Sequence, residues 1–224
     1  MRHPAKYTDS FIPIFADILN EYGAEKVLDP FAGTGKLASV KQYGFNGSVY
    51  ANELEREWLE PNVYGCDSLT YCDAEALDYP LEFFDAICTS PTYGNRMADH
   101  HNAKDGSRRI TYTHCLGRQL ADGNTGKMQW GKAYRDKHAA IYKNIIPFLK
   151  VGGVFILNIS NHIRKGEEID VVSWHKEELE KNGLTLIEDK QIETPRMKQG
   201  ANADKRPRTE HILLFEKKEG NKND

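Results

Sequence analysis

The sequence contains no CxxC pair, no internal repeat and no long apolar run. Its four cysteines are too few for a disulfide scaffold in a chain of 224 residues, so we expect free thiols in a reducing cytoplasm. The longest apolar run, from about Val154 to Ile159, is far shorter than the roughly 18 residues of a membrane span. The charged first residues are not followed by an apolar stretch, so no signal peptide is expected. These absences exclude secreted, membrane-embedded and fibrous proteins.

The sequence also lacks a marked excess of charge of one sign. It contains 30 Lys and Arg and 33 Asp and Glu, so its net charge is −3. This near-balance of the total charge argues against a nucleic-acid partner. The charges of separate segments of the chain argue otherwise. Residues 21–92 hold four basic and thirteen acidic side chains, a balance of −9, whereas residues 95–143 hold ten basic and four acidic ones, a balance of +6. The first segment therefore suits a cationic ligand, and the second suits phosphates.

Short apolar strands and amphipathic helices alternate along the chain. This pattern predicts an α/β fold with a mostly parallel sheet of about seven strands and a terminal antiparallel hairpin. We expect a single domain over residues 1–216, with an insert at about 95–131, and a flexible tail at 217–224. The expected strands are residues 26–28, 48–51, 62–64, 84–89, 154–160, 184–187 and 211–215, and the expected helices are residues 11 to about 23, 36–43, 133–149 and 171–181.

The first motif, Asp29-Pro30-Phe31-Ala32-Gly33-Thr34-Gly35, follows the first expected strand and opens a helix. Glycines at such a turn let the backbone approach a ligand closely. A phosphate loop of the Walker type is excluded, because it needs Gly-x4-Gly-Lys-Ser/Thr and Lys36 has no Ser or Thr after it. A dinucleotide loop fits formally, as Gly33-x-Gly35-x-x-Ala38 with Glu53 placed for a ribose. However, acidic Asp29 is badly placed for a pyrophosphate and suits a cationic amino group instead.

This motif resembles the cofactor loop of class I S-adenosylmethionine-dependent methyltransferases, particularly the amino-methyltransferases that act on DNA. The resemblance implies a Rossmann-like fold and S-adenosylmethionine as the cofactor. It extends to residues 3–7, which look like the family's segment that closes over the methionine moiety. Three acidic residues would have separate roles, with Asp29 contacting the ammonium through water, Glu53 binding the ribose hydroxyls and Asp67 binding the adenine amine. The implied cofactor-binding residues are Asp29, Phe31, Gly33, Thr34, Gly35, Glu53, Asp67 and Ser90.

The second motif, Ser90-Pro91-Thr92-Tyr93, directly follows the expected strand at 84–89. It resembles the Asp/Asn/Ser-Pro-Pro-Tyr/Phe catalytic motif of the same family, with Thr92 in place of the second proline. An exocyclic amine is a poor nucleophile because its lone pair is delocalised, and two acceptors aimed at its N–H groups free that lone pair. The resemblance implies that Ser90 Oγ and the Pro91 carbonyl are these acceptors and that Tyr93 stacks on the base. A serine at the first position favours cytosine over adenine.

The positive segment at 95–143 also contains aromatic residues, a combination typical of phosphate contacts and base stacking. A second basic loop joins the last two expected strands, and we expect both loops to flank a flipped base. No metal site is expected, because His100, His101, His114 and Cys115 lack the second spaced pair that zinc needs. The expected nucleic-acid-binding residues are Arg96, Arg108, Arg109, Arg118, Trp130, Arg196, Lys198, Arg206 and Arg208.

Three hypotheses remain open at this point. The leading one is a cytoplasmic DNA amino-methyltransferase with no membrane partner, which binds S-adenosylmethionine and methylates cytosine rather than adenine. The first alternative is an RNA guanine amino-methyltransferase, because that group has a similar Pro-Tyr-Gly-x-Arg run and residues 91–96 match it with Thr92 inserted. The second alternative is a catalytically inactive methyltransferase fold that binds nucleic acid, and Thr92 motivates it.

Overall fold

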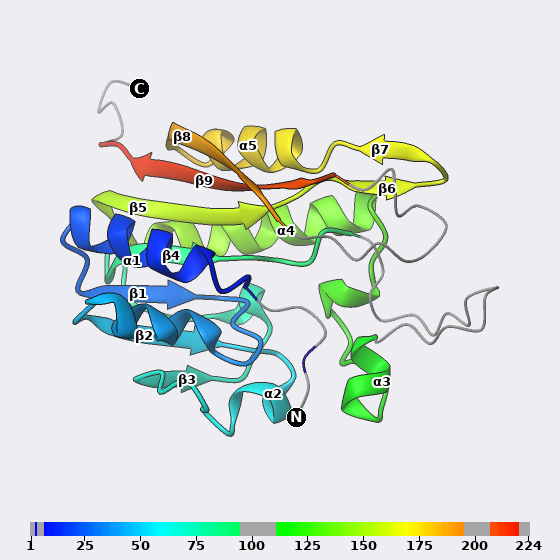
Figure 1. Ribbon diagram of the computed structural model, residues 1–224, viewed down its shortest axis with the longest axis horizontal. Helices are drawn as coiled ribbons and strands as arrows, with labels where there is room; N and C mark the ends of the chain where they lie inside the picture. The colour runs from blue at the N-terminus through cyan, green and yellow to red at the C-terminus, as the bar shows by residue number, and fades with distance from the viewer. Residues whose placement is uncertain (1–2, 4–6, 95–110, 195–206, 220–224) are drawn as a thin grey trace.

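The computed structural model describes residues 3, 7–94, 111–194 and 207–219, and its central feature is one seven-stranded sheet (Figure 1). The strand order is β3-β2-β1-β4-β5-β9-β8. The first five strands are parallel, and β9 runs antiparallel to both of its neighbours. The predicted α/β fold with a terminal antiparallel hairpin is therefore confirmed.

The strands of the sheet differ in burial according to their position. The central strands read as nearly continuous buried runs, as parallel strands covered on both faces do. In the edge strand β8, exposed residues are interspersed with residues that are at least partly buried, because only one face of this strand is covered. The bounds are β1 Lys26–Asp29, β2 Ser48–Asn52, β3 Ser68–Thr70, β4 Phe84–Thr89, β5 Leu149–Ile159, β8 Leu184–Glu193 and β9 Thr209–Lys217.

Helices cover the two faces of the sheet, with α1 in front of it and α4 behind it in Figure 1. Helix α1 (Phe11–Glu21) buries an apolar stripe that includes Phe11, Phe15 and Leu19 against one face. The 3₁₀ helix η1 (Lys36–Tyr43) packs on the same face. Helices α4 (Lys132–Ile145), η4 (Ile146–Phe148) and α5 (Val172–Lys181) cover the other face. Among the described residues, no helix is both long and apolar enough to cross a membrane.

Shorter elements lie in the connections between the strands. Helix α2 (Arg56–Leu59) follows β2, and η2 (Ala74–Ala76) follows β3. Helices α3 (Tyr112–Leu116) and η3 (Thr125–Lys127) lie in the expected insert. A two-stranded hairpin, β6 (His162–Arg164) and β7 (Glu167–Ile169), follows β5 and was not predicted.

The third strand lies later in the chain than the sequence pattern predicted. Residues 62–64 form a turn in which Val63 is 68% exposed, so this apolar residue does not mark a buried strand. The strand that pairs with β2 is β3, in which Ser68, Leu69 and Thr70 are all half-buried. A short edge strand of this composition lacks the apolar run that identified the other parallel strands. The shift moves Asp67 from the end of a strand to its start.

Candidate active site

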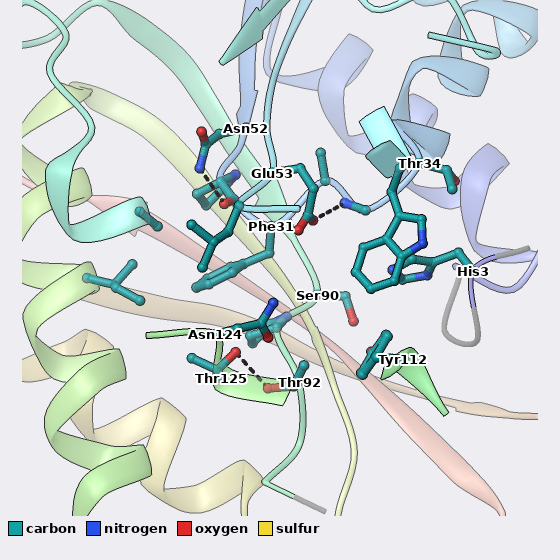
Figure 2. Close-up of a pocket in the computed structure, with 18 of the residues that line it drawn as sticks. His3, Phe31, Thr34, Asn52, Glu53, Ser90, Thr92, Tyr112, Asn124 and Thr125 are labelled. Carbon is teal, nitrogen blue, oxygen red and sulfur yellow. Dashed lines mark hydrogen bonds between the residues drawn. The ribbon is translucent and has the colours of Figure 1, made fainter. Parts of the chain in front are cut away.

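A cavity of about 270 Å³ opens at the carboxyl ends of the parallel strands, where open α/β sheets bind their ligands. The loops after β1, β2, β3 and β4 form its walls (Figure 2). The insert covers it with Tyr112, Asn124 and Thr125, and Lys137 of α4 closes one side. Most of the predicted cofactor residues and all of the predicted catalytic residues thus meet in one place. Phe31, Gly33, Thr34, Glu53, Ser90, Pro91 and Tyr93 line this cavity.

The turn after β1 requires its two glycines. Gly33 and Gly35 both have positive φ values, +56° and +78°. A Cβ atom on Gly33 would lie 3.2 Å from the ring of His3, and one on Gly35 would lie 2.7 Å from Cys66 Sγ. The Gly33 amide donates a hydrogen bond of 2.9 Å to Glu53 Oε2, so the loop and the end of β2 are joined directly. The backbone therefore approaches the cavity as closely as the sequence motif predicted.

Asp29 lies behind this turn rather than on the cavity wall. Its side chain is fully buried and accepts hydrogen bonds from Tyr7 Oη at 3.0 Å, Thr89 Oγ1 at 2.7 Å and the Phe31 amide at 3.1 Å. Burial raises the pKa of this carboxyl to about 6, against the opposing effect of these hydrogen bonds. The side chain therefore ties β1, β4 and the segment before α1 together. Asp29 therefore makes no direct contact with the cavity, and the expected ammonium contact through water stays a prediction.

Glu53 occupies the position predicted for a ribose-binding carboxylate. It lies directly after β2, is 9% exposed and lines the cavity. Its two oxygens accept hydrogen bonds from the amides of Gly33 and Glu55, at 2.9 and 3.0 Å. Burial nevertheless raises the pKa of Glu53 to about 7, because loss of solvation outweighs both hydrogen bonds. A ligand that donates hydroxyl groups here would compensate for that loss of solvation.

The acidic residue after β3 is Asp73, not Asp67. Asp67 precedes β3, binds Lys41 at 2.6 Å and the Val49 amide at 2.7 Å, and is not on the cavity wall. Asp73 lines the cavity and accepts a hydrogen bond of 2.6 Å from Lys137 Nζ. The sequence analysis missed Asp73 because it placed the third strand six residues too early. Asp73 lies three residues after the end of β3, so only a correct placement of that strand would have identified it.

The Ser90–Tyr93 loop is fixed by hydrogen bonds to η3 of the insert and to α4. Thr92 Oγ1 donates to Thr125 Oγ1 at 2.8 Å, and the Thr92 carbonyl accepts from Tyr134 Oη. Figure 2 shows Thr92 and Thr125 joined below Ser90. These bonds hold in place the segment that the family's second proline would otherwise stiffen. Thr92 therefore does not leave the loop unsupported.

The far wall of the cavity contains two polar residues that the sequence analysis did not identify. Glu210 of β9 is 8% exposed and accepts hydrogen bonds from Tyr93 Oη at 3.3 Å and from Asn158 Nδ2 at 3.1 Å. Asn158 belongs to β5, and both residues line the cavity. Neither residue lies in a local motif, and Glu210 is 117 positions from Tyr93. Only the pairing of β5 with β9 brings them to the site.

The predicted nucleic-acid residues are only partly described. Arg118 forms ion pairs with Glu55 and Glu57, at 2.8 and 2.7 Å, and its contact with a phosphate stays a prediction. Trp130 packs against Tyr134 of α4 and Trp174 of α5, and its amide donates to the Gly94 carbonyl, so it joins the end of the insert to the core of the domain. Arg208 is exposed. The other predicted residues, Arg96, Arg108, Arg109, Arg196, Lys198 and Arg206, lie outside the described residues, as do His100 and His101.

Metal binding was not predicted for this chain. His114 and Cys115 lie in α3, and Cys115 is a free thiol. Within residues 3, 7–94, 111–194 and 207–219, no group of three or more His, Cys, Asp or Glu side chains is arranged to hold an ion.

Solved structures similar to this chain include methyltransferases and one enzyme of another class. An S-adenosylmethionine-dependent methyltransferase from Clostridium acetobutylicum is 14% identical with a TM-score of 0.56, over 96% of this chain and 93% of that one. The 1,6-didemethyltoxoflavin-N1-methyltransferase of Burkholderia thailandensis, with bound S-adenosylhomocysteine, is 16% identical with a TM-score of 0.51, over 94% and 80%. The [4+2]-cyclase SpnF is 14% identical with a TM-score of 0.56, over 98% and 86%. The chain therefore has the Rossmann-like fold of class I methyltransferases, a fold that also supports a cyclase.

Other matches are longer than this chain. It spans 48% of TrmN from Thermus thermophilus, to which it is 17% identical with a TM-score of 0.48. No family model and no curated protein matches the sequence.

Proposed function

We propose that this chain binds S-adenosylmethionine in the cavity and methylates an exocyclic amino group of a base in DNA, with cytosine favoured over adenine. The observation that carries the proposal is the meeting of two motifs in one cavity. The glycine turn after β1 and the Ser90–Tyr93 loop after β4 come from neighbouring parallel strands and face the same space. A cofactor and a substrate bound there would lie next to each other.

The residues of the cavity fit this cofactor. Glu53 is placed to accept the ribose hydroxyls, and Asp73 is placed to accept the adenine amine. The hydroxyl of Thr34 is buried and has no hydrogen-bond partner among the described residues, so it is available to a polar group of the ligand. When bound, S-adenosylmethionine supplies an electrophilic methyl group. The chain itself supplies position and hydrogen-bond acceptors.

The Ser90–Tyr93 loop provides the acceptors that an exocyclic amine needs. Ser90 and Pro91 both line the cavity, so Ser90 Oγ and the Pro91 carbonyl are placed to accept the two N–H groups of the amine. When both N–H groups of the amine donate hydrogen bonds to these acceptors, a tetrahedral nitrogen is favoured, and its lone pair then faces the methyl donor. No metal and no strong base are needed before transfer, and the rate enhancement comes from positioning and electrostatics.

Two features of the sequence support a nucleic-acid substrate and the choice of base. The residues 95–143 have a balance of +6, which suits a phosphate backbone. Serine at the first position of the Ser90–Tyr93 loop supports cytosine over adenine by resemblance. The RNA guanine alternative rests on the similar run at residues 91–96, and the inactive-module alternative rests on Thr92, whose hydrogen bonds support an ordered loop.

Incubation with tritiated S-adenosylmethionine and duplex DNA, followed by digestion to nucleosides, tests this proposal. We expect label in N4-methylcytosine. The Ser90→Ala variant is expected to lose about 100-fold in rate while it retains cofactor binding, as for loss of one precisely placed donor or acceptor in an active site. The matched control is Ser173→Ala, an exposed serine on α5. Label in transfer RNA but not in DNA would favour the alternative, and cofactor binding without label in either would favour the inactive module.

A further inference from the structure

Three side chains, two from the loop after β4 and one from β9, form a continuous series of hydrogen bonds at the substrate end of the cavity. Ser90 Oγ lies 3.3 Å from Tyr93 Oη, and Tyr93 Oη donates to Glu210 Oε2 at 3.3 Å. Asn158 Nδ2 donates to the same carboxylate oxygen at 3.1 Å and holds it in place. All four residues line the cavity. A buried carboxylate thus lies two hydrogen bonds away from the atom that would touch the substrate amine.

The Glu210 carboxylate also determines which groups donate and which accept in this series of hydrogen bonds. An ionised carboxylate can only accept, so Tyr93 donates its single hydroxyl proton to Glu210. Tyr93 then has only its lone pairs to offer Ser90, and the Ser90 hydroxyl must donate to Tyr93. With its proton turned away, Ser90 Oγ presents lone pairs to the cavity. This is the orientation that an acceptor for an amine N–H requires.

We propose that Glu210 is the acceptor of the proton that the substrate amine loses on methylation, and that Tyr93 and Ser90 conduct this proton to it. The inference rests on the proposed function. The amine nitrogen forms a bond to the methyl carbon with its lone pair, while the bond from that carbon to sulfur breaks and its electron pair stays on sulfur. As positive charge develops on the nitrogen during transfer, its proton passes to Ser90 Oγ while the Ser90 proton moves to Tyr93 and the Tyr93 proton moves to Glu210.

The step is balanced within the site, and Glu210 returns its proton to solvent after the product leaves. The same carboxylate lies near the nitrogen as positive charge develops on it, so it also stabilises the transition state electrostatically. Ser90 and Tyr93 touch or approach the substrate directly. Glu210 acts through them and is a positioning residue as well as the end of the relay.

Single-turnover methylation by Glu210→Gln and Tyr93→Phe tests the relay. Each variant is expected to lower the rate of methyl transfer by roughly 100-fold, in the usual range for loss of a proton-transfer partner. The dissociation constant for S-adenosylhomocysteine, measured by calorimetry, is expected to stay within about twofold of that of the wild type. The double variant is expected to be no slower than the slower single variant, because both substitutions interrupt the same proton relay.

A structural role for Glu210 would give other results. Formate added to Glu210→Ala is expected to restore part of the rate, because a small carboxylate can fill the vacated space. The control is Glu216→Gln, a carboxylate at the other end of β9, which is expected to leave the rate unchanged. Retention of the rate within threefold by Glu210→Gln, or rate losses that multiply in the double variant, would overturn the relay. A wild type that binds cofactor but methylates no base would overturn the proposed function together with the relay.

Discussion

Glu53 is the residue whose protonation is most closely linked to ligand binding. Its carboxyl has lost most of its solvation, and the two amides that donate to it do not fully compensate. The ligand-free protein therefore holds this group with a pKa of about 7, near physiological pH. In the proposed binding mode, ribose hydroxyls would donate to the ionised form and favour it, so a bound cofactor would lower the pKa of Glu53.

Binding of S-adenosylhomocysteine is accordingly expected to strengthen as the pH rises from about 5.5 to about 7 and to release a proton. The sign follows because the free carboxyl is largely protonated below pH 7 and the bound one is ionised. Calorimetry at pH 6.5 in two buffers of different ionisation enthalpy measures the released proton. Glu53→Gln should bind more weakly and without this pH dependence. An affinity of the wild type that is constant from pH 5.5 to 8.5 would contradict this role for Glu53.

Asp73 and Asp67 form a matched pair for testing which carboxylate faces the adenine. Asp73→Asn is expected to weaken binding of S-adenosylhomocysteine by about tenfold, or about 1.4 kcal/mol, because an accepting oxygen becomes an amide. Asparagine keeps the N-cap that Asp73 provides to η2, so the fold should be preserved. Asp67→Asn should leave the affinity unchanged, because Asp67 is not on the cavity wall. Equal effects of the two variants would contradict the placement.

At the scale of elements, a buried carboxylate directly before α2 binds the described part of the insert. Glu55 is fully buried, and its Oε1 accepts hydrogen bonds from the Ala121 amide and Asn124 Nδ2, both at 2.8 Å. Arg118 neutralises it at 2.8 Å. Asn124 and Tyr112 in turn line the cavity. The fastening therefore determines how closely the insert covers a bound cofactor.

Removal of the Arg118 side chain is expected to loosen residues 112–125 of the insert over the cavity without unfolding the sheet. Arg118→Ala leaves Glu55 buried without its cation, and we expect amide hydrogen exchange in residues 112–125 to accelerate by about tenfold. The affinity for S-adenosylhomocysteine should fall as well. The control is Arg56→Ala on α2, which removes an exposed pair with Glu60 and a contact with the Tyr71 ring but leaves Glu55 paired with Arg118. Unchanged exchange in Arg118→Ala would show that the insert is held by other contacts.

The elements that could be predicted are those whose buried residues form a recognisable apolar pattern in the sequence. Residues 154–159 form an apolar run because they are buried on both faces of the sheet, and they lie in β5 as predicted. Helix α5 begins and ends within one residue of the prediction. The strand β3 was misplaced because an edge strand of half-buried residues has no such pattern, and this error carried Asp67 into the site in place of Asp73. Glu210 and Asn158 could not be found, because only strand pairing brings them to the loop at Ser90.

At the scale of the whole molecule, acidic and basic residues are concentrated in different segments of the chain. Residues 21–92 are strongly acidic and hold most of the cofactor cavity, whereas residues 95–143 are basic. The net charge of −3 conceals both fields. A cationic cofactor and a polyanion can therefore be attracted to different parts of one surface.

Salt is consequently expected to affect the two ligands differently. The affinity for duplex DNA should fall steeply as the salt concentration rises from 50 to 200 mM, because each neutralised phosphate releases counterions. The affinity for S-adenosylhomocysteine should change by less than about twofold over the same range. Fluorescence anisotropy with labelled DNA and calorimetry with the small ligand measure the two dependences. A DNA affinity that is independent of salt would argue against phosphate contacts by the basic segment.

The position of β9 has a consequence for the order in which the protein folds during synthesis. This strand lies inside the sheet between β5 and β8, yet it follows every other strand in the sequence. Until the ribosome has made residues 209–217, β8 has no partner and β5 presents an unpaired apolar edge. The nascent chain is then most exposed to aggregation and to capture by chaperones. The final strand both closes that edge and delivers Glu210, so catalytic competence and resistance to aggregation would be acquired in the same event.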